Sequence, residues 1–503
     1  MSTKKPSQAA GKRVAADTKN PKVVKSTSGS HGRLHALAEH PVALRRTALV
    51  LGAIMLVTYL MAVYAAFTTS LIPGKYLGGG FLLSFVITAV LFYILVWQKV
   101  KKKLIIGAAV LALVGVFVNV GVFIAARTAD ALINSVSTGD TTTYEEYAIV
   151  ALKKNAIKLD TPGQTITVLG STDTNDVRTA IATKTPAAIT PIASPAESIV
   201  ALEDGSAQMT LYATSYMREL QTSTNNGLFQ QLEVLATIRV KVTNKTASAD
   251  VTKPFVIYVS GIDTYGAVSK TSRSDVNILI AVNPKTHKVL LVNTPRDYYV
   301  QLHGTTGVKD KLTHAGIYGV DMSEKTLEDL YNIDINYNVR INFTSLEKLV
   351  DAMGGVEVQS EYNFSSGGYN FVAGNNQLNG KQALAFSRER YSFEGGDRTR
   401  GQNQMKVITA IISKMTQPAM ALKAGEIVNA LNGVFETNMA SDDIAALIRT
   451  QLDTMAKWNV VSSSVDGAGA SEPTYSMGAQ RLYVMVPNEM SLNSAKQQLK
   501  DTL

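Results

Sequence analysis

"RSDVNILIAVNPKTHKVLLVNTPRD", residues 273–297, contains two aliphatic runs that are separated by the polar segment "NPKTHK". Short apolar runs of this kind are typical of buried strands, and the asparagine–proline pair between them is a turn signal. We therefore expect an antiparallel hairpin. Asp275 precedes its first strand and Arg296 follows its second, so pairing brings both residues to one edge of the sheet. Arg273 lies two residues before Asp275 and shares that edge.

The segments on either side of this hairpin alternate between expected strands and helices. Residues 254–263, "PFVIYVSGID", have the composition of a buried strand that ends at a glycine and Asp263. Residues 382–390, "QALAFSRER", are expected to form another strand, and residues 398–415 a helix. Strands that alternate with helices predict a mainly α/β architecture in which helices pack in layers on a sheet.

Four arginines lie close together in "SRERYSFEGGDRTRGQNQ", residues 387–404. On the expected strand, the two-residue period places Arg388 and Arg390 on one face. On the helix that follows, Arg400 and Gln404 are four residues apart and are therefore neighbours. A cluster of this kind is either an ordinary solvated strand end or a site for an anionic ligand.

The placement of the charges at the ends of apolar strands favours the anionic ligand. Ligands of α/β proteins commonly bind at such ends, and planar guanidinium groups pair bidentately with phosphate oxygens. Asp263 and Asp275 would then hold Mg²⁺, which prefers one or two carboxylates together with phosphate oxygens. Asp397 lies at the first turn of the expected helix. The pattern therefore indicates a site for a metal–phosphate group.

Three apolar runs precede this domain, within residues 47–126, which contain no acid. Each run is about 20 residues long, the length that crosses the ~30 Å hydrocarbon core of a bilayer as a helix. A secretory signal peptide has one shorter apolar stretch and a cleavage site. We therefore expect three transmembrane helices that anchor the chain permanently.

Basic residues predict the orientation of these helices. Residues 1–46 carry ten Lys and Arg against two acids, and "QKVKKK", residues 98–103, adds four lysines between the second and third spans. The positive-inside rule places the N-terminus in the cytoplasm and everything after Arg127 outside. When these groups, Lys75 and Arg127 are removed from the overall +9, residues 128–503 have a net charge of −5.

The absence of some residue types excludes several kinds of chemistry. The chain has no cysteine, which excludes thiolate catalysis and cysteine-bound metals. Its six histidines lack the spacing of a zinc site.

Composition divides the chain into four expected parts. Residues 1–46 form a disordered basic cytoplasmic tail, and residues 47–126 form the three transmembrane helices. Residues 128–247 form a small extracellular α/β accessory domain, and residues 248–503 form the larger extracellular catalytic domain.

Five separated blocks of the sequence resemble, in order, the motifs of the LytR-CpsA-Psr family of Gram-positive bacteria. The blocks lie within residues 254–417 and read "GIDTYG", the hairpin segment, "DKLTHAGIYG", "GNNQLNGKQALAFSRER" and "GGDRTRGQNQ". Three spans followed by an accessory module resemble the capsule-type branch of that family. The resemblance implies a layered α/β/α catalytic domain with a mixed sheet.

The resemblance also implies a function in cell wall and capsule assembly. It implies a ligase that moves a glycopolymer, a capsular polysaccharide or a teichoic-acid-like polymer, from a polyprenyl-pyrophosphate carrier to peptidoglycan. It assigns Mg²⁺ or Mn²⁺ to Asp263 and Asp275, and a further site acid, our candidate general base, to Asp397. Arg398 is outside the assigned set and is expected to face solvent. Pyrophosphate binding is assigned to Arg273, Arg296, Arg388, Arg390, Arg400 and Gln404, of which Arg296, Arg388 and Arg390 are also catalytic candidates.

The residue types suit such a reaction. Transfer of a phosphate to a sugar hydroxyl needs positioning and charge stabilisation more than covalent catalysis. A polyprenyl tail needs an apolar pocket, and three helical stripes have apolar faces that would line it, although a hydrophobic core needs the same faces. These stripes are residues 327–333, 346–353 and 407–415.

Two other functions are compatible with the sequence. One is a membrane-anchored transcriptional regulator of polysaccharide synthesis. We do not expect its basic tail to bind DNA, because neither a helix-turn-helix pattern nor interleaved aromatics accompany the charges. The other is a lipid-pyrophosphate-binding pyrophosphatase. The expected partners are the carrier-linked glycopolymer, peptidoglycan, the membrane and other polysaccharide-assembly proteins.

Overall fold

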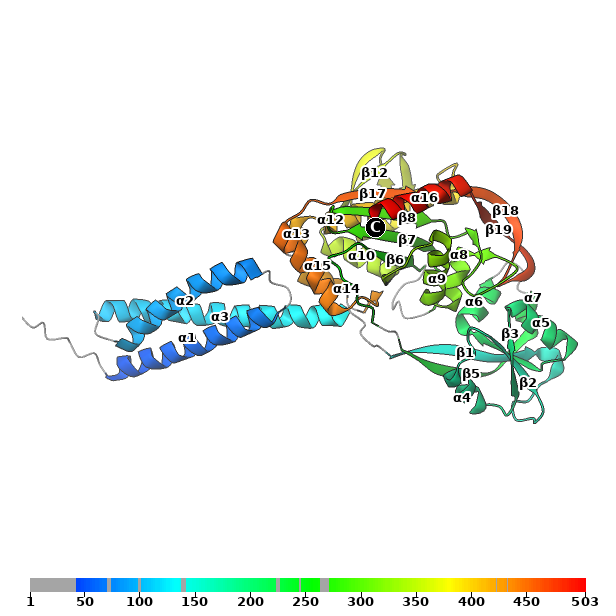
Figure 1. Cartoon of the computed structure of the whole chain (residues 1–503), viewed down its shortest axis with the longest axis horizontal. Helices are drawn as coiled ribbons and strands as arrows, with labels where there is room; N and C mark the ends of the chain where they lie inside the picture. Colours follow the sequence, from blue (N-terminus) through cyan, green and yellow to red (C-terminus); the bar gives the residue numbers. More distant parts are fainter. Residues whose placement is uncertain are drawn as a thin grey trace, which may run out of the picture.

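The chain forms an elongated molecule with a helical bundle at one end and two separate sheets at the other (Figure 1). The computed structural model describes residues 42–69, 74–97, 101–136, 142–222, 227–243, 246–262, 271–421, 423–431 and 433–503.

Three helices make up the bundle: α1 (Val42–Thr68), α2 (Gly74–Trp97) and α3 (Lys102–Val136). All three are long and apolar enough to cross a membrane. Small residues such as Gly52 and Ala62 are buried on α1, which lets the helices approach closely. The third helix continues beyond the expected limit of the apolar region at residue 126.

The next part of the chain folds around a five-stranded sheet of order β3-β2-β4-β1-β5. The long strands β1 and β5 pair antiparallel along their whole length, with one register shift. Helices pack against this sheet, and α6 and α7 lead back to the edge strand β5. The strands are β1 (Thr142–Leu152), β2 (Thr165–Leu169), β3 (Ala188–Ile192), β4 (Met209–Ala213) and β5 (Leu232–Thr243), and the helices are α4 (Asn175–Ala182), α5 (Pro195–Asp204), α6 (Thr214–Thr222) and α7 (Gly227–Gln231).

A six-stranded mixed sheet of order β16-β11-β6-β7-β8-β17 forms the centre of the larger domain. The expected hairpin is its middle, β7 and β8, paired antiparallel from Asn277 and Thr294 to Asn283 and Lys288. Parallel partners extend the sheet on both sides, β11 beside β6 and β17 beside β8. The strands are β6 (Phe255–Gly261), β7 (Val276–Asn283), β8 (Lys288–Thr294), β11 (Tyr337–Ile341), β16 (Glu436–Thr437) and β17 (Asn459–Ser464).

Helices cover both faces of this sheet, which confirms the layered α/β/α fold with a mixed sheet. Alternate residues of the hairpin face opposite cores: Leu279 packs with α9 and α16, and Ile278 packs with α12 and α15. Burial on both faces explains why both strands are almost wholly apolar. The helices are α8 (Leu312–Ala315), α9 (Val320–Tyr331), α10 (Phe343–Ala352), α11 (Gly380–Arg388), α12 (Gly396–Met415), α13 (Pro418–Ala421), α14 (Ala424–Leu431), α15 (Ser441–Thr454) and α16 (Glu489–Thr502).

Four short two-stranded ribbons complete the domain. The largest, β18 with β19, passes close to the accessory sheet in Figure 1. The ribbons are β9 (Tyr299–Val300) with β10 (Asp310–Lys311), β12 (Val356–Ser360) with β15 (Gly374–Leu378), β13 (Phe364–Ser366) with β14 (Tyr369–Phe371), and β18 (Gly467–Thr474) with β19 (Gly478–Pro487).

One expected strand is a helix. Most of residues 382–390 belongs to α11, so the predicted strand is wrong, whereas the helix predicted from residue 398 is confirmed as part of α12. Asn379 caps α11 by accepting from the backbone N–H of Gln382, and the Gln382 side chain accepts from the backbone N–H of Asn379. This capping box is a helix start signal in the sequence that outweighs a short apparent two-residue period.

Gly380, at the start of α11, is expected to be intolerant of a side chain. A Cβ there would lie 2.3 Å from the backbone oxygen of Glu347 in α10, so the two helices would have to separate. We expect Gly380→Ala to lower the free energy of unfolding by roughly 1–3 kcal/mol, read as a lower melting temperature of the purified chain. Gly401→Ala in α12 is the matched control, because a Cβ there meets nothing within 4 Å. An equal effect of both changes would contradict the close approach of α10 and α11.

Candidate active site

The polar residues of interest lie where several strands of the large sheet end. Strands β6, β8, β11 and β17 run in the same direction, and β7 starts at the edge where they end. Gly261 at the end of β6 pairs with Val276 at the start of β7. Carboxyl ends of aligned strands are a common position for ligand sites in α/β folds.

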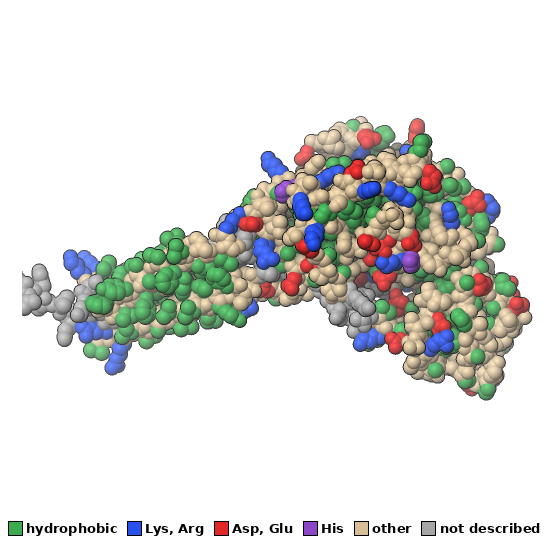
Figure 2. Space-filling model, viewed as in Figure 1, with side chains coloured by type: hydrophobic (Ala, Val, Ile, Leu, Met, Phe, Trp, Pro, Cys, Tyr) green, Lys and Arg blue, Asp and Glu red, His purple; other side chains and the backbone are tan. Residues whose placement is uncertain are grey.

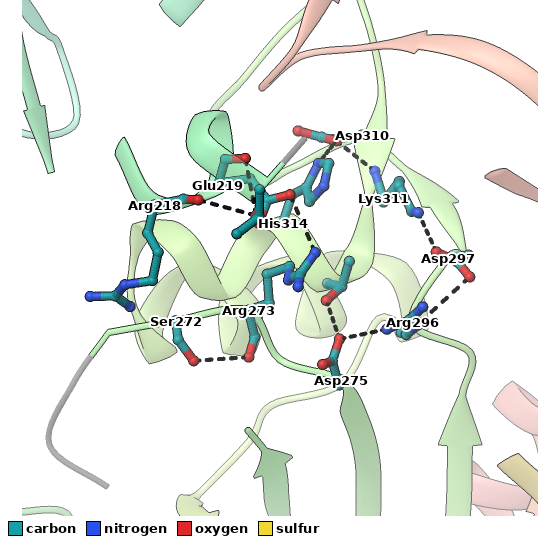
Figure 3. Close-up of polar contacts among 12 residues, drawn as sticks. Arg218, Glu219, Ser272, Arg273, Asp275, Arg296, Asp297, Asp310, Lys311 and His314 are labelled. Atoms are coloured by element: carbon teal, nitrogen blue, oxygen red, sulfur yellow. Dashed lines mark hydrogen bonds and ion pairs between the residues drawn. The ribbon is translucent and has the colours of Figure 1, made fainter. Parts of the chain in front are cut away.

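The hairpin brings Asp275 and Arg296 together, as its sequence pattern predicts. The Arg296 Nη1 donates to Asp275 Oδ1 at 3.2 Å, and the Thr313 hydroxyl donates to the same oxygen at 3.0 Å (Figure 3). The Asp275 side chain is 13% exposed. Sequence reasoning missed Thr313, although it lies in the block "DKLTHAGIYG".

A second carboxylate, that of Asp297, also contacts the Arg296 guanidinium. Asp297 Oδ2 lies 3.7 Å from Arg296 Nε, and Lys311 Nζ forms an ion pair with Asp297 Oδ1. Asp297 is buried. A buried charge is stable only when it is paired, so Lys311 compensates Asp297. The side chains of Lys311, Asp297, Arg296 and Asp275 thus form one continuous series of ion pairs (Figure 3). Neither Asp297 nor Lys311 was predicted from the sequence.

Arg273 contacts the accessory domain. Its Nη1 lies 3.3 Å from Glu219 Oε1 of α6, and Glu219 has only 11% of its side chain exposed. Arg273 and Asp275 line one small cavity of about 140 Å³ together with residues of α6. The accessory domain therefore supplies part of the surroundings of the predicted site, which no pattern in the sequence indicated.

Arg388 and Arg390 line one cavity, but not for the predicted reason. Arg388 is the last residue of α11, where its guanidinium carbon lies 4.2 Å from the centroid of the Phe343 ring. Arg390 lies two residues beyond the helix, and its Nη2 donates to the Tyr391 hydroxyl at 2.5 Å. A helix end followed by a turn, and not a strand period, brings the two guanidinium groups to the same cavity.

Glu389 organises the turn that carries Arg390. Its Oε1 accepts from the backbone N–H groups of Arg390, Tyr391 and Ser392 at 3.0, 2.7 and 2.9 Å. Burial raises the pKa of Glu389, but hydrogen bonds, led by the one from the Ser392 backbone, outweigh burial, so the pKa lies below its ordinary value. The ionised carboxylate is therefore the form that the turn stabilises.

A cavity of about 710 Å³ at the strand ends has a lining of mixed chemistry. Its polar lining residues include Asp275, Arg296, Arg388, Arg390, Arg400 and Gln404. Its apolar lining residues include Ile262, Ile341, Leu346, Leu384, Val407 and Ile408. Two of the three apolar stripes, on α10 and α12, thus reach this cavity, whereas Leu327 and Tyr331 of the third lie in the core.

A second cavity of about 620 Å³ adjoins the first. Both cavities are lined by Asp275, Arg296, Arg400 and Gln404, which form a shared wall. The second cavity is also lined by Ser464 at the end of β17, by Asp466, and by Tyr483 of β19. Arg400 and Gln404 therefore share a helix face, as predicted, and face both cavities.

Arg398 borders the second cavity and is not simply solvent-facing. Its Nη2 lies 2.8 Å from Asp466 Oδ2, although 63% of its side chain is exposed. Its role is therefore separate from that of Arg388 and Arg390, which line the first cavity.

The described residues fit the predicted metal only in part. Asp263 lies outside the described residues, and so does the side chain of Asp397, whose backbone lies in the first turn of α12. Within the described ranges, no three His, Cys, Asp or Glu side chains are grouped to hold a metal ion. Asp275, a single carboxylate beside arginines, has the donor set that suits Mg²⁺ when phosphate oxygens supply further ligands.

The chain is similar to a family model, to known relatives and to solved structures. A sequence model described as the LytR_cpsA_psr family matches residues 217–501. A polyisoprenyl-teichoic acid–peptidoglycan teichoic acid transferase, TagU, of Enterococcus faecalis is 35% identical over 254 residues, which are 50% of this chain and 80% of the relative. TagU of Bacillus anthracis is 31% identical over 291 residues, 57% of this chain and 90% of the relative. The crystal structure of B. subtilis TagV matches with 28% identity and a TM-score of 0.43, covering 50% of this chain and 98% of that one.

Replacement of Arg388 or Arg390 by Lys is expected to weaken binding of a polyprenyl pyrophosphate almost as much as replacement by Ala. Lysine keeps the charge but loses the planar fork, and the loss of charge-assisted hydrogen bonds predicts about tenfold weaker affinity or more. The measurement is a titration of the purified chain with the lipid. Arg398→Ala is the control and should bind as the wild type does. Equal affinities of the wild type, Arg388→Lys, Arg390→Lys and Arg398→Ala would leave the cluster as ordinary surface.

The lowered pKa of Glu389 predicts that this residue stabilises the fold to an extent that depends on pH. Because its pKa is lowered in the fold, the carboxylate stabilises the chain above the ordinary glutamate pKa of about 4.3, and this contribution is lost as the pH falls through the lowered value. We expect the wild type to have a higher melting temperature than Glu389→Gln at pH 5 to 8. The difference between the two melting temperatures should shrink below about pH 4. Glu361→Gln is the control, because Glu361 is exposed and paired with Lys406. A constant difference across this range would contradict the assignment.

Proposed function

The chain belongs to the LytR-CpsA-Psr family, and on this premise we propose that it transfers a glycopolymer from a polyprenyl-pyrophosphate carrier to peptidoglycan. TagU of E. faecalis and TagU of B. anthracis are named as transferases that join a polyisoprenyl-linked teichoic acid to peptidoglycan. The family match includes all the predicted site residues. The chain is accordingly a transferase of cell wall glycopolymer assembly.

The observation that carries this proposal is the shared wall between two cavities. A partly apolar cavity of about 710 Å³ suits the lipid part of the carrier, and the arginines in its lining suit the pyrophosphate. The second cavity shares Arg296, Arg400 and Gln404 with the first and would admit the acceptor. Two reactants can thus approach one phosphate from different sides.

The contact between the large domain and the helical bundle suits a lipid-linked substrate. Helix α14 contacts both α3 of the bundle and α10, whose Leu346 lines the partly apolar cavity. Lys75, at the start of α2, forms an ion pair with Asp453 of the large domain at 3.0 Å. The substrate cavity therefore lies one helix away from the bundle that would occupy the membrane.

The distribution of basic residues supports an outward-facing enzyme. In Figure 2, Lys and Arg gather at the end of the apolar bundle that is remote from the large domain. Arg45 and Arg46 of α1 and Lys102 and Lys103 of α3 lie at the starts of their helices, which form that end. By the positive-inside rule this end is cytoplasmic, so the large domain lies outside the cell.

The proposed reaction is a single displacement at phosphorus. A hydroxyl oxygen of peptidoglycan bonds to the phosphorus that carries the glycopolymer, and the bond from that phosphorus to the bridging oxygen breaks. Polyprenyl phosphate leaves, and the hydroxyl proton passes to a carboxylate, for which we propose Asp397. Arg296, Arg388, Arg390 and Arg400 would donate to the phosphate oxygens and stabilise the charge that develops on them.

We propose Mg²⁺ as the metal, held by Asp275 and Asp263 together with oxygens of the pyrophosphate. When bound, the ion would neutralise negative charge on the pyrophosphate. The Asp275 carboxylate is held in place by Thr313 and Arg296, so it is oriented before substrate arrives.

The proposal is tested by incubating the full chain with Mg²⁺, a polyprenyl-pyrophosphate-linked oligosaccharide and peptidoglycan fragments. Mass spectrometry should detect the oligosaccharide phosphate joined to the glycan fragment. Release of free oligosaccharide phosphate without a joined product would indicate a pyrophosphatase instead.

Asp275→Asn is expected to remove the metal dependence of the reaction while it preserves the fold. The asparagine oxygen can still accept from Thr313 and Arg296, so the melting temperature without metal should change little. Transfer with Mg²⁺ should fall about 100-fold or more, and Mn²⁺ binding measured by calorimetry should weaken. Asp329→Asn, at an exposed position that lines none of these cavities, is the control. A large loss of melting temperature in Asp275→Asn would instead assign the residue a structural role.

A further inference from the structure

The accessory domain contacts the large domain through hydrogen bonds and apolar packing. The Tyr216 hydroxyl of α6 donates to the backbone oxygen of Ser476 at 2.7 Å, and the Tyr475 hydroxyl donates to the backbone oxygen of Ala193 at 2.7 Å. A single hydrophobic cluster contains Tyr212 of the accessory sheet and Met477 of the β18–β19 turn. These contacts place residues of the two domains side by side.

A polar cleft of about 460 Å³ lies along this contact, within the size range of ligand pockets. Its accessory wall comes from β1, the start of α6 and Arg239 of β5, and its catalytic wall from Thr271, Ile317 and Tyr318. Tyr144 is 65% exposed. The lining contains hydroxyl-bearing and aromatic residues together with two carboxylates. Glu146 pairs with Arg239 at 3.0 Å, and Glu145 accepts from the Tyr147 hydroxyl at 2.6 Å. The hydroxyl-bearing residues are Thr143, Tyr144, Tyr147, Thr172, Thr214, Ser215, Thr271 and Tyr318.

Helix α6 connects this cleft to the active site. Ser215, Arg218, Glu219 and Thr222 follow the spacing of one helix face and line the small cavity of about 140 Å³ beside Asp275. Ser215 and Arg218 also line the cleft, and Glu219 forms the ion pair with Arg273. In Figure 3 the Arg218 guanidinium points away from the Glu219–Arg273 pair.

Asp275 lines three cavities: the partly apolar one, the second one beside β19, and the small one under α6. Three groups must extend away from the reacting phosphorus in different directions. The acceptor and the leaving lipid phosphate lie roughly in line, and the glycopolymer, which stays bonded to the phosphorus, must extend to one side of that line. The first two cavities suit the lipid and the acceptor. The cavity under α6 is a third direction, and it shares Ser215, Arg218 and Ile317 with the polar cleft.

We propose that the cleft binds saccharide units of the carrier-linked glycopolymer, and that Arg218 contacts an acidic group on them. This inference rests on the proposed function. Protein hydroxyl groups can both donate hydrogen bonds to sugar hydroxyls and accept hydrogen bonds from them. Tyrosine rings can pack on the apolar faces of sugar rings. A guanidinium adds recognition of a carboxylate or phosphate. The carboxylates of Glu146 and Glu219, which lie in the same surroundings as Arg218, form their ion pairs with Arg239 and Arg273.

The test is a titration of the full-length chain in detergent with three ligands. These are bare polyprenyl pyrophosphate, the same carrier with a neutral oligosaccharide, and the carrier with an oligosaccharide that contains uronic acid. The wild type should bind both sugar-bearing carriers more tightly than the bare one, and the acidic one most tightly. Arg218→Ala should bind the acidic carrier about tenfold more weakly and the bare carrier equally well.

A matched control separates this effect from a general change of charge. Lys184→Ala removes an exposed cation of the accessory domain outside the cleft, and it should bind all three ligands as the wild type does. Equal binding of the acidic carrier by Arg218→Ala and wild type would overturn the inference, and so would an equal loss for the bare or neutral carrier. If the wild type binds none of the three ligands, the proposed function itself fails.

Discussion

The antiparallel register of β7 and β8 is the constraint on which the rest of the structure depends. Asn277 pairs with Thr294, so the residues just outside the hairpin, Asp275 and Arg296, meet at one edge. Both faces of the hairpin are buried by different cores. A shift by one residue would exchange every side chain between these faces. The packing of the helices therefore fixes the register, and the register fixes the charged pair.

The charges around this pair form a supported network. Asp297 is buried beside Arg296 and is compensated by Lys311, and Glu219 of the accessory domain holds Arg273. Paired, buried charges add little to stability by themselves. Their consequence here is orientation: guanidinium groups whose positions are set before a phosphate arrives need little reorganisation when it binds.

The cavities follow from the same geometry. At the edge where β6, β8, β11 and β17 end, residues of α10, α11 and α12 line the partly apolar cavity, and residues of α12 and β19 line the second one. Asp275 stands where these spaces meet. A site with several openings suits a reaction that joins two polymers, because each chain needs its own path away from the phosphorus.

Much of the architecture was determined by the sequence alone. Three apolar runs in an acid-free segment indicate the helical bundle, and the paired aliphatic runs of residues 273–297 indicate the central hairpin, since both patterns reflect burial that the side chains themselves demand. The helix that carries Arg400 and Gln404 is equally evident, because its face repeats every three to four residues. The predicted roles of Asp263 and Asp397 remain predictions.

What only the tertiary structure decided concerns contacts between distant segments. Arg388 ends a helix instead of lying on a strand, because the capping box at Asn379 and packing against α10 outweigh a short local pattern. The Asp297–Lys311 pair and the Glu219–Arg273 pair join residues that are far apart in the chain or in different domains. Local sequence carries no record of such partners, because an ion pair depends on where two chain segments are placed by the packing of apolar surfaces elsewhere.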